Sequence, residues 1–167
     1  MGDAELMLLM RVQALQSRYA RCLDNDELEH WPGFFTQDCT YKVTSADNHQ
    51  RGFPVGLIYA DSRDALSDRV KSLREANIYE GQSYRHVLSM PVLLTTHADG
   101  SIETETSFMV VRVVRGGQGM LFASGRYLDR IDVAGGLRDG GGMPSLFRQK
   151  IVVCDSSETD TLLALPL

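Results

Sequence analysis

The sequence has few of the residues that mark specialised classes of protein. Its 167 residues include only three cysteines, Cys22, Cys39 and Cys154, and this odd number at wide spacing does not suit a disulfide framework. No apolar run approaches the roughly 20 residues of a membrane-spanning helix, and the first residues are acidic where a signal peptide is basic. We therefore expect reduced thiols, a cytoplasmic location and no association with a membrane.

Motifs that bind metals or activate nucleophiles are also missing. The spacing of the four histidines, His30, His49, His86 and His97, includes no pair four or five residues apart. Glu27-x-x-His30 matches half of a carboxylate-bridged di-iron site, but no second copy exists, so an exposed polar helix face is the better interpretation. The chain has no Gly-x-Ser-x-Gly elbow. We expect no metal, no cofactor and no catalytic residue in this chain.

Composition predicts an ordinary packed globule. The chain is 43% hydrophobic and 23% charged, with a formal net charge of -5. This acidic balance argues against a nucleic-acid partner, because affinity for nucleic acids depends on Lys and Arg neutralising phosphates. The length suits one domain, which we expect to span residues 1–167.

The first half of the chain shows helical periodicity. Residues 4–24 place Leu8, Val12, Leu15, Tyr19 and Cys22 on one stripe, and residues 63–76 repeat the pattern behind a cap at Asp61-Ser62. A short helix is expected over residues 27–35, with Pro32 in its last turn. Extended segments are expected over residues 39–44 and 55–60.

The second half is rich in β-forming residues. Four long strands are expected over residues 84–96, 102–115, 120–133 and 146–154, joined by turns at 98–100 and 116–119 and a longer loop at 135–145. Three helices packed on one face of a curved, mainly antiparallel sheet make an α+β cone. The apolar tail 161–167 is expected to dock on its own domain or on a partner.

Polar side chains are numerous within these regular elements, and they allow two interpretations. The set comprises Tyr19, Asp24, Tyr41, Asp61, Arg69, Arg74, Arg85, His86, Arg126, Tyr127 and Asp129. A pocket on the concave face of the sheet would let an Asp or His act as a general base. Structural ion pairs within the fold or at a subunit interface are the favoured interpretation, because buried ionic groups are usually paired.

Several motifs, in order along nearly the whole chain, resemble the β subunits of aromatic-ring-hydroxylating (Rieske) dioxygenases. The first is Trp31-Pro32-Gly33-Phe34-Phe35-Thr36-Gln37-Asp38-Cys39-Thr40-Tyr41-Lys42-Val43, which matches W-x-x-F-F-x-x-D-C-x-Y-x-V. Others are residues 56–62, 68–70, 73–80, 84–86 and 123–129. The closing residues 153–156 and 160–167 look similar to the small subunits of terephthalate 1,2-dioxygenase and salicylate 5-hydroxylase.

The resemblance implies a cone fold like that of nuclear transport factor 2 and ketosteroid isomerase. It implies a non-catalytic small subunit that serves as a structural scaffold for a larger α subunit, commonly as three α and three β, in terephthalate-, salicylate- or benzoate-type aromatic acid degradation. The α subunit would carry a Rieske [2Fe-2S] centre and a mononuclear Fe(II), fed with electrons from NADH by a reductase, and a homotrimer of the small subunit is also possible. We expect Asp61, Arg69, Arg85 and Arg126, which lie within the family motifs, to make subunit contacts.

Two alternatives remain open on the sequence alone. One is a free-standing isomerase or dehydratase of the same fold, with Asp61 or His86 as the base and Tyr19 or Tyr127 donating a hydrogen bond to the developing oxyanion. The other is a binding module that tunes the choice of ring substrate by the α subunit from a distance.

Overall fold

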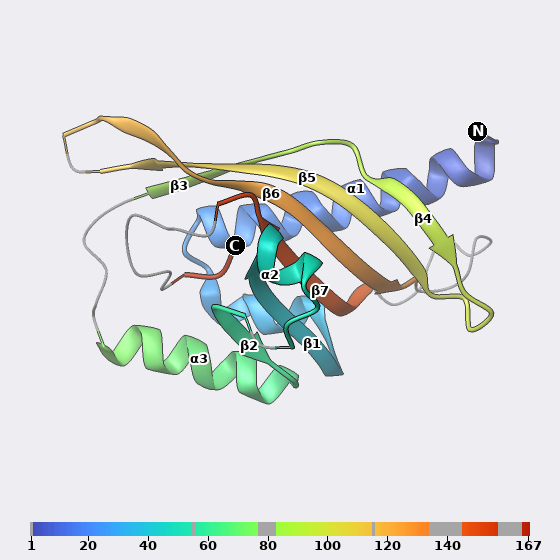
Figure 1. Ribbon diagram of the computed structural model, residues 1–167, viewed down its shortest axis with the longest axis horizontal. Coiled ribbons are helices and arrows are strands. Elements are labelled where there is room, and N and C mark those ends of the chain that lie inside the picture. The colour runs from blue at the N-terminus through green and yellow to red at the C-terminus, as the bar shows by residue number, and fades with distance from the viewer. Residues whose placement is uncertain (1, 55, 77–82, 115, 134–144, 157–164) are drawn as a thin grey trace.

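A computed structural model describes residues 2–54, 56–76, 83–114, 116–133, 145–156 and 165–167. Seven strands form one curved sheet in the order β2-β1-β7-β6-β5-β3, with β4 also paired to β5 (Figure 1). Strands β1 and β7 run parallel, whereas all the other pairs are antiparallel. The expected mainly antiparallel sheet is therefore confirmed.

The two long helices form where the sequence predicts them. Helix α1 spans Asp3–Asp24 and buries apolar residues at helical spacing, and α3 spans Arg63–Ala76 and buries Leu66, Val70 and Leu73. The hydroxyl of Ser62 accepts a hydrogen bond from the Ala65 backbone N–H, which is the cap expected at the start of α3. Periodic burial of apolar residues favours both helices, and local capping also favours α3, so the sequence alone is enough to predict them.

The other helical segments are shorter and differ from expectation. The segment after α1 is a 3-10 helix, η1, spanning Leu28–Phe34, with Pro32 inside it. Proline removes a backbone donor and disfavours the helical conformation of the residue before it, so a regular α-helix is unfavourable there. A single turn, α2, spans Ala46–Gln50 and is not expected from the sequence; the Ser45 hydroxyl caps it by accepting from the Asn48 backbone N–H.

The strands confirm the β-rich second half, with one correction. They are β1 Phe35–Ser45, β2 Ile58–Ala60, β3 Ser83–Leu88, β4 Val92–Thr96, β5 Ile102–Val113, β6 Gly119–Asp132 and β7 Leu146–Cys154. The single strand expected over residues 84–96 is two strands that pair with different parts of β5. Pro91 lies in the break, and it has no N–H for a sheet ladder.

The turns at 98–100 and 116–119 join strands as predicted, with Gly100 and Gly117 at positive φ values of 82° and 84°. The loop expected at 135–145 lies outside the described residues except for Ser145, and so does residue 55 at the start of the expected strand 55–60. Of the apolar tail, residues 165–167 are described.

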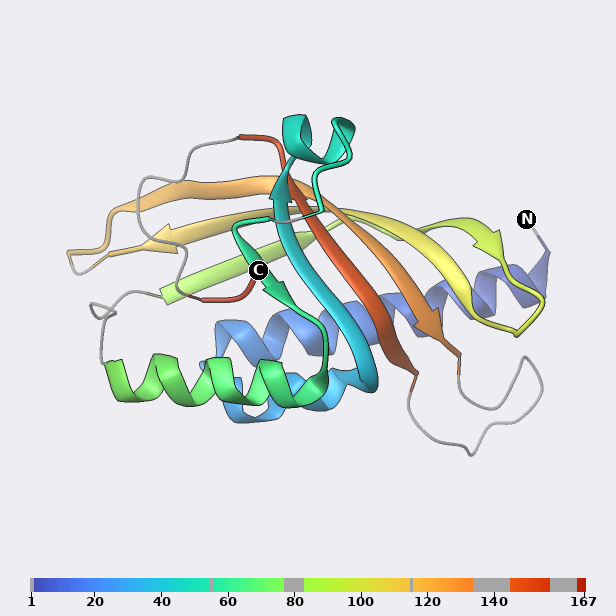
Figure 2. The same ribbon diagram turned by 60° about the horizontal axis from the view of Figure 1, so that its bottom comes forward.

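The helices α1, η1 and α3 lie on one side of the sheet, and the short α2 lies on the other side (Figure 2). Residues of β5 alternate between buried and exposed, so one face of this strand packs toward the helices. The core between the layers is strongly aromatic: the ring of Tyr19 from α1 packs edge-on against the rings of Phe34, Phe35, Tyr127 and Phe147.

A buried ion pair lies within this aromatic core. The Lys150 ammonium of β7 is 3.2 Å from the Asp129 carboxylate of β6, and both residues are almost completely buried. The Gln16 side chain of α1 donates to Asp129 and accepts from Lys150. The ammonium also lies 3.7 Å from the centre of the Tyr127 ring. This cluster joins α1 to the middle of the sheet.

Candidate functional site

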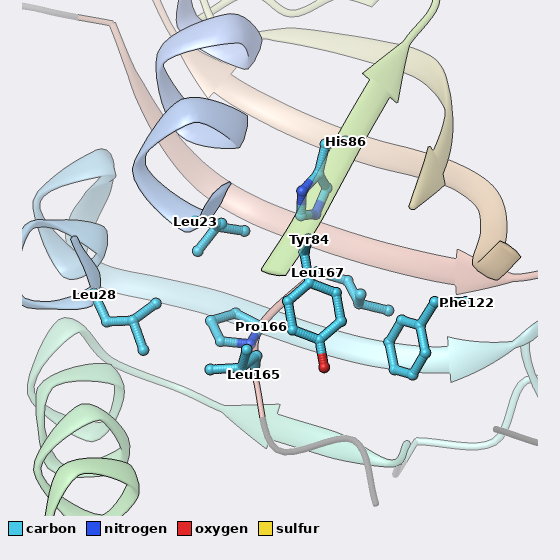
Figure 3. Close-up of a pocket in the computed structure, with 8 residues that line it drawn as sticks. All are labelled: Leu23, Leu28, Tyr84, His86, Phe122, Leu165, Pro166 and Leu167. Atoms are coloured by element: carbon cyan, nitrogen blue, oxygen red, sulfur yellow. The ribbon is translucent and has the colours of Figure 1, made fainter. Parts of the chain in front are cut away.

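The concave side of the sheet contains an apolar pocket that the chain itself fills. Its walls come from α1, η1, β3, β6 and the last described residues of the chain, and only about 10 Å³ of space is left, about enough for one water. Figure 3 shows the residues that line it: Leu23, Leu28, Tyr84, His86, Phe122, Leu165, Pro166 and Leu167. The pocket therefore lies on the concave face of the sheet, where one interpretation of the sequence places a ligand site, but it is packed as tightly as a protein core.

A buried carboxylate–imidazole pair lies at one side of this pocket. Asp24, in the last turn of α1, accepts a hydrogen bond from the backbone N–H of His86 on β3, and its Oδ1 lies 2.6 Å from His86 Nδ1. Their side chains are only 5% and 2% exposed. The second ring nitrogen, His86 Nε2, is buried and makes no hydrogen bond within the described residues. Asp24 thus holds the imidazole in one orientation, with a polar atom beside the pocket.

Two tyrosines hold the backbone of Leu167 at the other side. The Tyr19 and Tyr41 hydroxyls donate to the Leu167 main-chain oxygen, at 2.7 and 3.2 Å, and the Leu167 N–H donates to the Tyr41 oxygen at 3.0 Å. Burial raises the pKa of both phenols above the ordinary value, so both remain neutral donors at physiological pH. The sequence leaves open whether the apolar tail docks on its own domain or on a partner, and residues 165–167 dock on this domain.

The opposite face of the sheet carries a group of exposed apolar side chains. Strand register places Val87 of β3 beside Met109 of β5, and Val111 of β5 beside Leu121 of β6. We call Val87, Val92, Met109 and Leu121 the outer-face patch; their exposed fractions lie between 47% and 60%. Adjacent apolar side chains at this exposure are typical of a protein–protein contact surface.

Comparison with known proteins decides between the two interpretations of this fold. A family described as "Ring hydroxylating beta subunit" matches residues 18–157. The chain belongs to this family. The expected cone fold and the resemblance that predicted it are confirmed.

Relatives of this β subunit cover nearly its whole length. It is 45% identical over 159 residues to the β 1 subunit of the terminal oxygenase component of terephthalate 1,2-dioxygenase from Comamonas, covering 95% of this chain and 97% of that one. It is 40% identical over 156 residues to the anthranilate 1,2-dioxygenase small subunit of Burkholderia cepacia, covering 93% and 92%. The chain is therefore a small subunit of an oxygenase component and part of an oxidoreductase system. Membership of this family implies an α-subunit partner.

Solved structures agree with this assignment. A β subunit attributed to an aromatic-ring-hydroxylating dioxygenase of Novosphingobium aromaticivorans superposes with a TM-score of 0.83 at 29% identity, covering 99% of this chain and all of that one. The β subunit of the benzoate 1,2-dioxygenase of Burkholderia mallei has a TM-score of 0.66 at 19% identity, with coverage of 86% and 87%, and so shows likeness of fold alone.

The sequence-predicted interface residues lie on two separate parts of the β subunit. Strand register places Arg85 and Arg126 on the face of the outer-face patch; Arg126 lies 3.7 Å from Glu105, and Arg85 lies 3.9 Å from Asp24 of α1. Asp61 is exposed just before α3, and Arg69 is half-buried on α3. These four residues therefore do not gather into one cluster on the surface of this chain.

The sequence-predicted pocket residues are brought together only in part. Tyr19, His86 and Tyr127 face the interior, where the Tyr127 ring stacks on Phe108 with 4.5 Å between centroids. Asp61 lies apart from them and is exposed. The carboxylate beside His86 is Asp24, which the sequence places in the polar set but does not identify as a partner of this histidine. The two residues are 62 positions apart, and no local pattern links them.

The potential metal ligands of the sequence are dispersed in the fold. The Glu27–His30 pair is exposed, with 4.0 Å between its closest atoms. The three cysteines are buried and unpaired. Burial raises the pKa of the Cys22 and Cys154 thiols to about 11. Among the residues that the structure describes, no three His, Cys, Asp or Glu side chains are placed to hold a metal ion. No helix in the described ranges is long and apolar enough to cross a membrane.

Proposed function

We propose that this chain is a non-catalytic scaffold subunit, a single domain over residues 1–167, of a cytoplasmic aromatic-ring-hydroxylating dioxygenase. Its partner is an α subunit, in a complex of three α and three β subunits. That partner carries the Rieske [2Fe-2S] centre and the mononuclear Fe(II), and a reductase supplies electrons from NADH. The outer-face patch, on a chain that belongs to the β-subunit family, is the observation that carries this proposal.

The outer-face patch has the composition of a contact surface. Apolar side chains of β3, β5 and β6 are neighbours through strand register, and charged side chains of Arg85, Glu105 and Arg126 lie on the same face. Subunit contacts commonly combine an apolar centre with a polar rim. We assign Arg85 and Arg126 to this rim. Asp61 and Arg69 remain proposed contacts of a second surface, near the start and middle of α3.

Aromatic carboxylic acids are the proposed substrates of the complex. Two relatives, at 45% and 40% identity, are subunits of dioxygenases named for such acids, terephthalate and anthranilate. The wider proposal therefore includes the benzoate and salicylate types. We do not propose that this subunit tunes which aromatic ring the α subunit accepts. The outer-face patch does not show how far it lies from the active site of the partner.

The free-standing enzyme is disfavoured by the family match, because the relatives that cover nearly the whole chain are small subunits of dioxygenases. With residues 165–167 in place, the pocket also leaves only about 10 Å³ beside His86. Asp61, one of the two bases expected for that enzyme, is exposed at the surface.

A matched pair of substitutions tests the scaffold proposal. Met109→Glu places a charge in the outer-face patch, whereas Met7→Glu makes the same change on α1; the two methionines are 47% and 55% exposed. Each variant is co-expressed with the α subunit and analysed by size-exclusion chromatography with light scattering and an iron assay.

We expect wild type and Met7→Glu to co-elute with the α subunit and its iron. Met109→Glu should bind at least about tenfold more weakly, which corresponds to about 1.4 kcal/mol. Full retention of the complex by Met109→Glu would remove the outer-face patch from the contact. Loss only with Met7→Glu would place the contact on the helical side.

A further inference from the structure

Residues 165–167 lie in the concave pocket in the manner of a bound ligand. The Leu167 side chain is almost fully buried, and both polar groups of its backbone are bonded to tyrosine hydroxyls. Figure 3 shows these three residues between the α1–η1 side and the β3–β6 side of the pocket. The hydroxyls reach this backbone from α1 and β1, elements that are distant from residue 167 in the sequence.

The remainder of the pocket surface matches a small aromatic molecule. The rings of Tyr84 and Phe122 meet edge to face with centroids 5.2 Å apart, and Leu23 and Leu28 complete an apolar wall. The buried Nε2 of His86 belongs to the lining, and the Tyr19 and Tyr41 hydroxyls bond the Leu167 backbone that fills the pocket. Ligand sites commonly combine apolar walls with a few such converging polar groups.

The charges around the pocket favour an anionic oxygen. The half-buried Arg69 of α3 interacts electrostatically with Tyr41, and the buried Arg112 guanidinium lies 5.3 Å from the centre of the Phe122 ring. The Arg112 guanidinium therefore lies beside the aromatic wall of the pocket, and Arg69 interacts with one of the two tyrosines that bond Leu167. Asp24, a buried carboxylate beside the pocket, is already bonded to His86, and the buried Asp129 is paired with Lys150.

We infer that Leu165–Leu167 is a displaceable plug in a small-molecule site, and that the site takes an aromatic monocarboxylic acid. One carboxylate oxygen replaces the Leu167 main-chain oxygen between Tyr19 and Tyr41, and the ring replaces the leucine side chains beside Tyr84 and Phe122. The inference does not use the contact with the α subunit, because strand register puts Met109 and Leu121 of the outer-face patch on the side of the sheet opposite to the buried Phe108 and Val110.

The plug sets the apparent affinity of the site. A ligand that binds only the open form has an apparent Kd equal to its intrinsic Kd divided by the open fraction. Weakening the plug therefore tightens ligand binding without any new contact. This relation gives the inference a quantitative test that does not depend on identifying the natural ligand.

The test uses benzoate as the probe and the full chain with two variants that open the pocket. Leu167→Ala removes the buried side chain of the plug, and a deletion of residues 165–167 removes the plug itself. Trp31 is the only tryptophan, and its ring centroid lies 5.1 Å from that of Tyr41, so its fluorescence reports on the site. Isothermal titration calorimetry measures the same binding independently, and acetophenone is the neutral control ligand.

We expect benzoate to bind Leu167→Ala at least about tenfold more tightly than wild type, and the deletion variant more tightly again. Acetophenone should bind each variant more weakly than benzoate does. Adding Tyr19→Phe to Leu167→Ala should weaken benzoate binding about tenfold, whereas adding Tyr59→Phe, a change of an exposed tyrosine on β2, should not.

Folded variants that bind benzoate no better than wild type would overturn the inference. If the deletion variant does not fold, Leu167→Ala alone decides by the same comparison. Equal binding of acetophenone and benzoate would refute the assignment to carboxylic acids. Retention of full affinity in the Tyr19→Phe variant would show that benzoate binds elsewhere.

Discussion

Replacing Lys150 with methionine is expected to destabilise this β subunit far more than an ordinary substitution does. Methionine is unbranched and apolar, so it fills most of the same space among the aromatic rings. The substitution removes the ammonium group that donates to both carboxylate oxygens of Asp129, and Asp129 is almost completely buried. The result is a core carboxyl group without this charged partner.

The expected loss is about 3–5 kcal/mol, the usual cost of removing one partner from a buried ion pair. Asp129→Leu should cost a similar amount, because it leaves the ammonium buried with Gln16 and the faces of aromatic rings. The double variant Lys150→Met with Asp129→Leu should instead be close to wild type, or more stable, because neither charge is then removed from water. The two single effects are therefore strongly non-additive.

The pH dependence follows from the same burial. Loss of hydration lowers the pKa of Lys150 from 10.5 to about 8 and raises that of Asp129 above its ordinary value. Between pH 8 and 10.5 the unfolded lysine holds a proton that the folded one has lost, so the Lys150 contribution to the free energy of unfolding rises with pH. For Asp129 the folded carboxyl holds the extra proton just above pH 3.8, so its contribution falls as pH rises there.

Urea denaturation followed by Trp31 fluorescence measures these effects, since Trp31 is completely buried in the folded chain. Comparing wild type with the double variant at about pH 8 and about pH 9.5 isolates the buried pair, because all the other titrating groups are shared. A loss below about 1 kcal/mol for Lys150→Met, or a double variant as unstable as the sum of the singles, would refute the account of a costly buried pair.

Two further predictions concern single contacts elsewhere in the fold. Gly125→Ala should lower the free energy of unfolding by about 1–3 kcal/mol in urea denaturation, because a Cβ there would overlap the Val153 carbonyl. Gly33→Ala is the control, since Gly33 has open space around it, and equal losses in the two variants would contradict this reason. The Arg74 hydrogen bonds lower the pKa of Glu29 to about 2, so its stabilising contribution is present above pH 4.5 and lost as pH falls through 2. Arg74→Ala should return the Glu29 pKa, followed by NMR titration, toward 4.5, and an unchanged titration would exclude this pairing.

The sequence by itself determined the elements whose signals are local. The spacing of Leu66, Val70 and Leu73 behind the Ser62 cap defined α3 to its observed bounds. The family motifs, which are runs of neighbouring residues, were enough to place the chain among ring-hydroxylating β subunits. Helix signals are visible in the sequence because capping and side-chain periodicity act within a few residues along the chain. Where a local breaker competed, as at Pro32 and Pro91, the type or continuity of the element was less well predicted.

Only the tertiary structure decided which polar groups meet. Asp24 reaches His86 across 62 positions, and Tyr41 reaches Leu167 across 126. It also decided that Met109 is exposed while the neighbouring Phe108 and Val110 are buried, which distinguishes the outer-face patch from the pocket side. These outcomes depend on strand register and on how α1 crosses the sheet. Because both are set by packing between segments far apart in the chain, no short-range pattern specifies them.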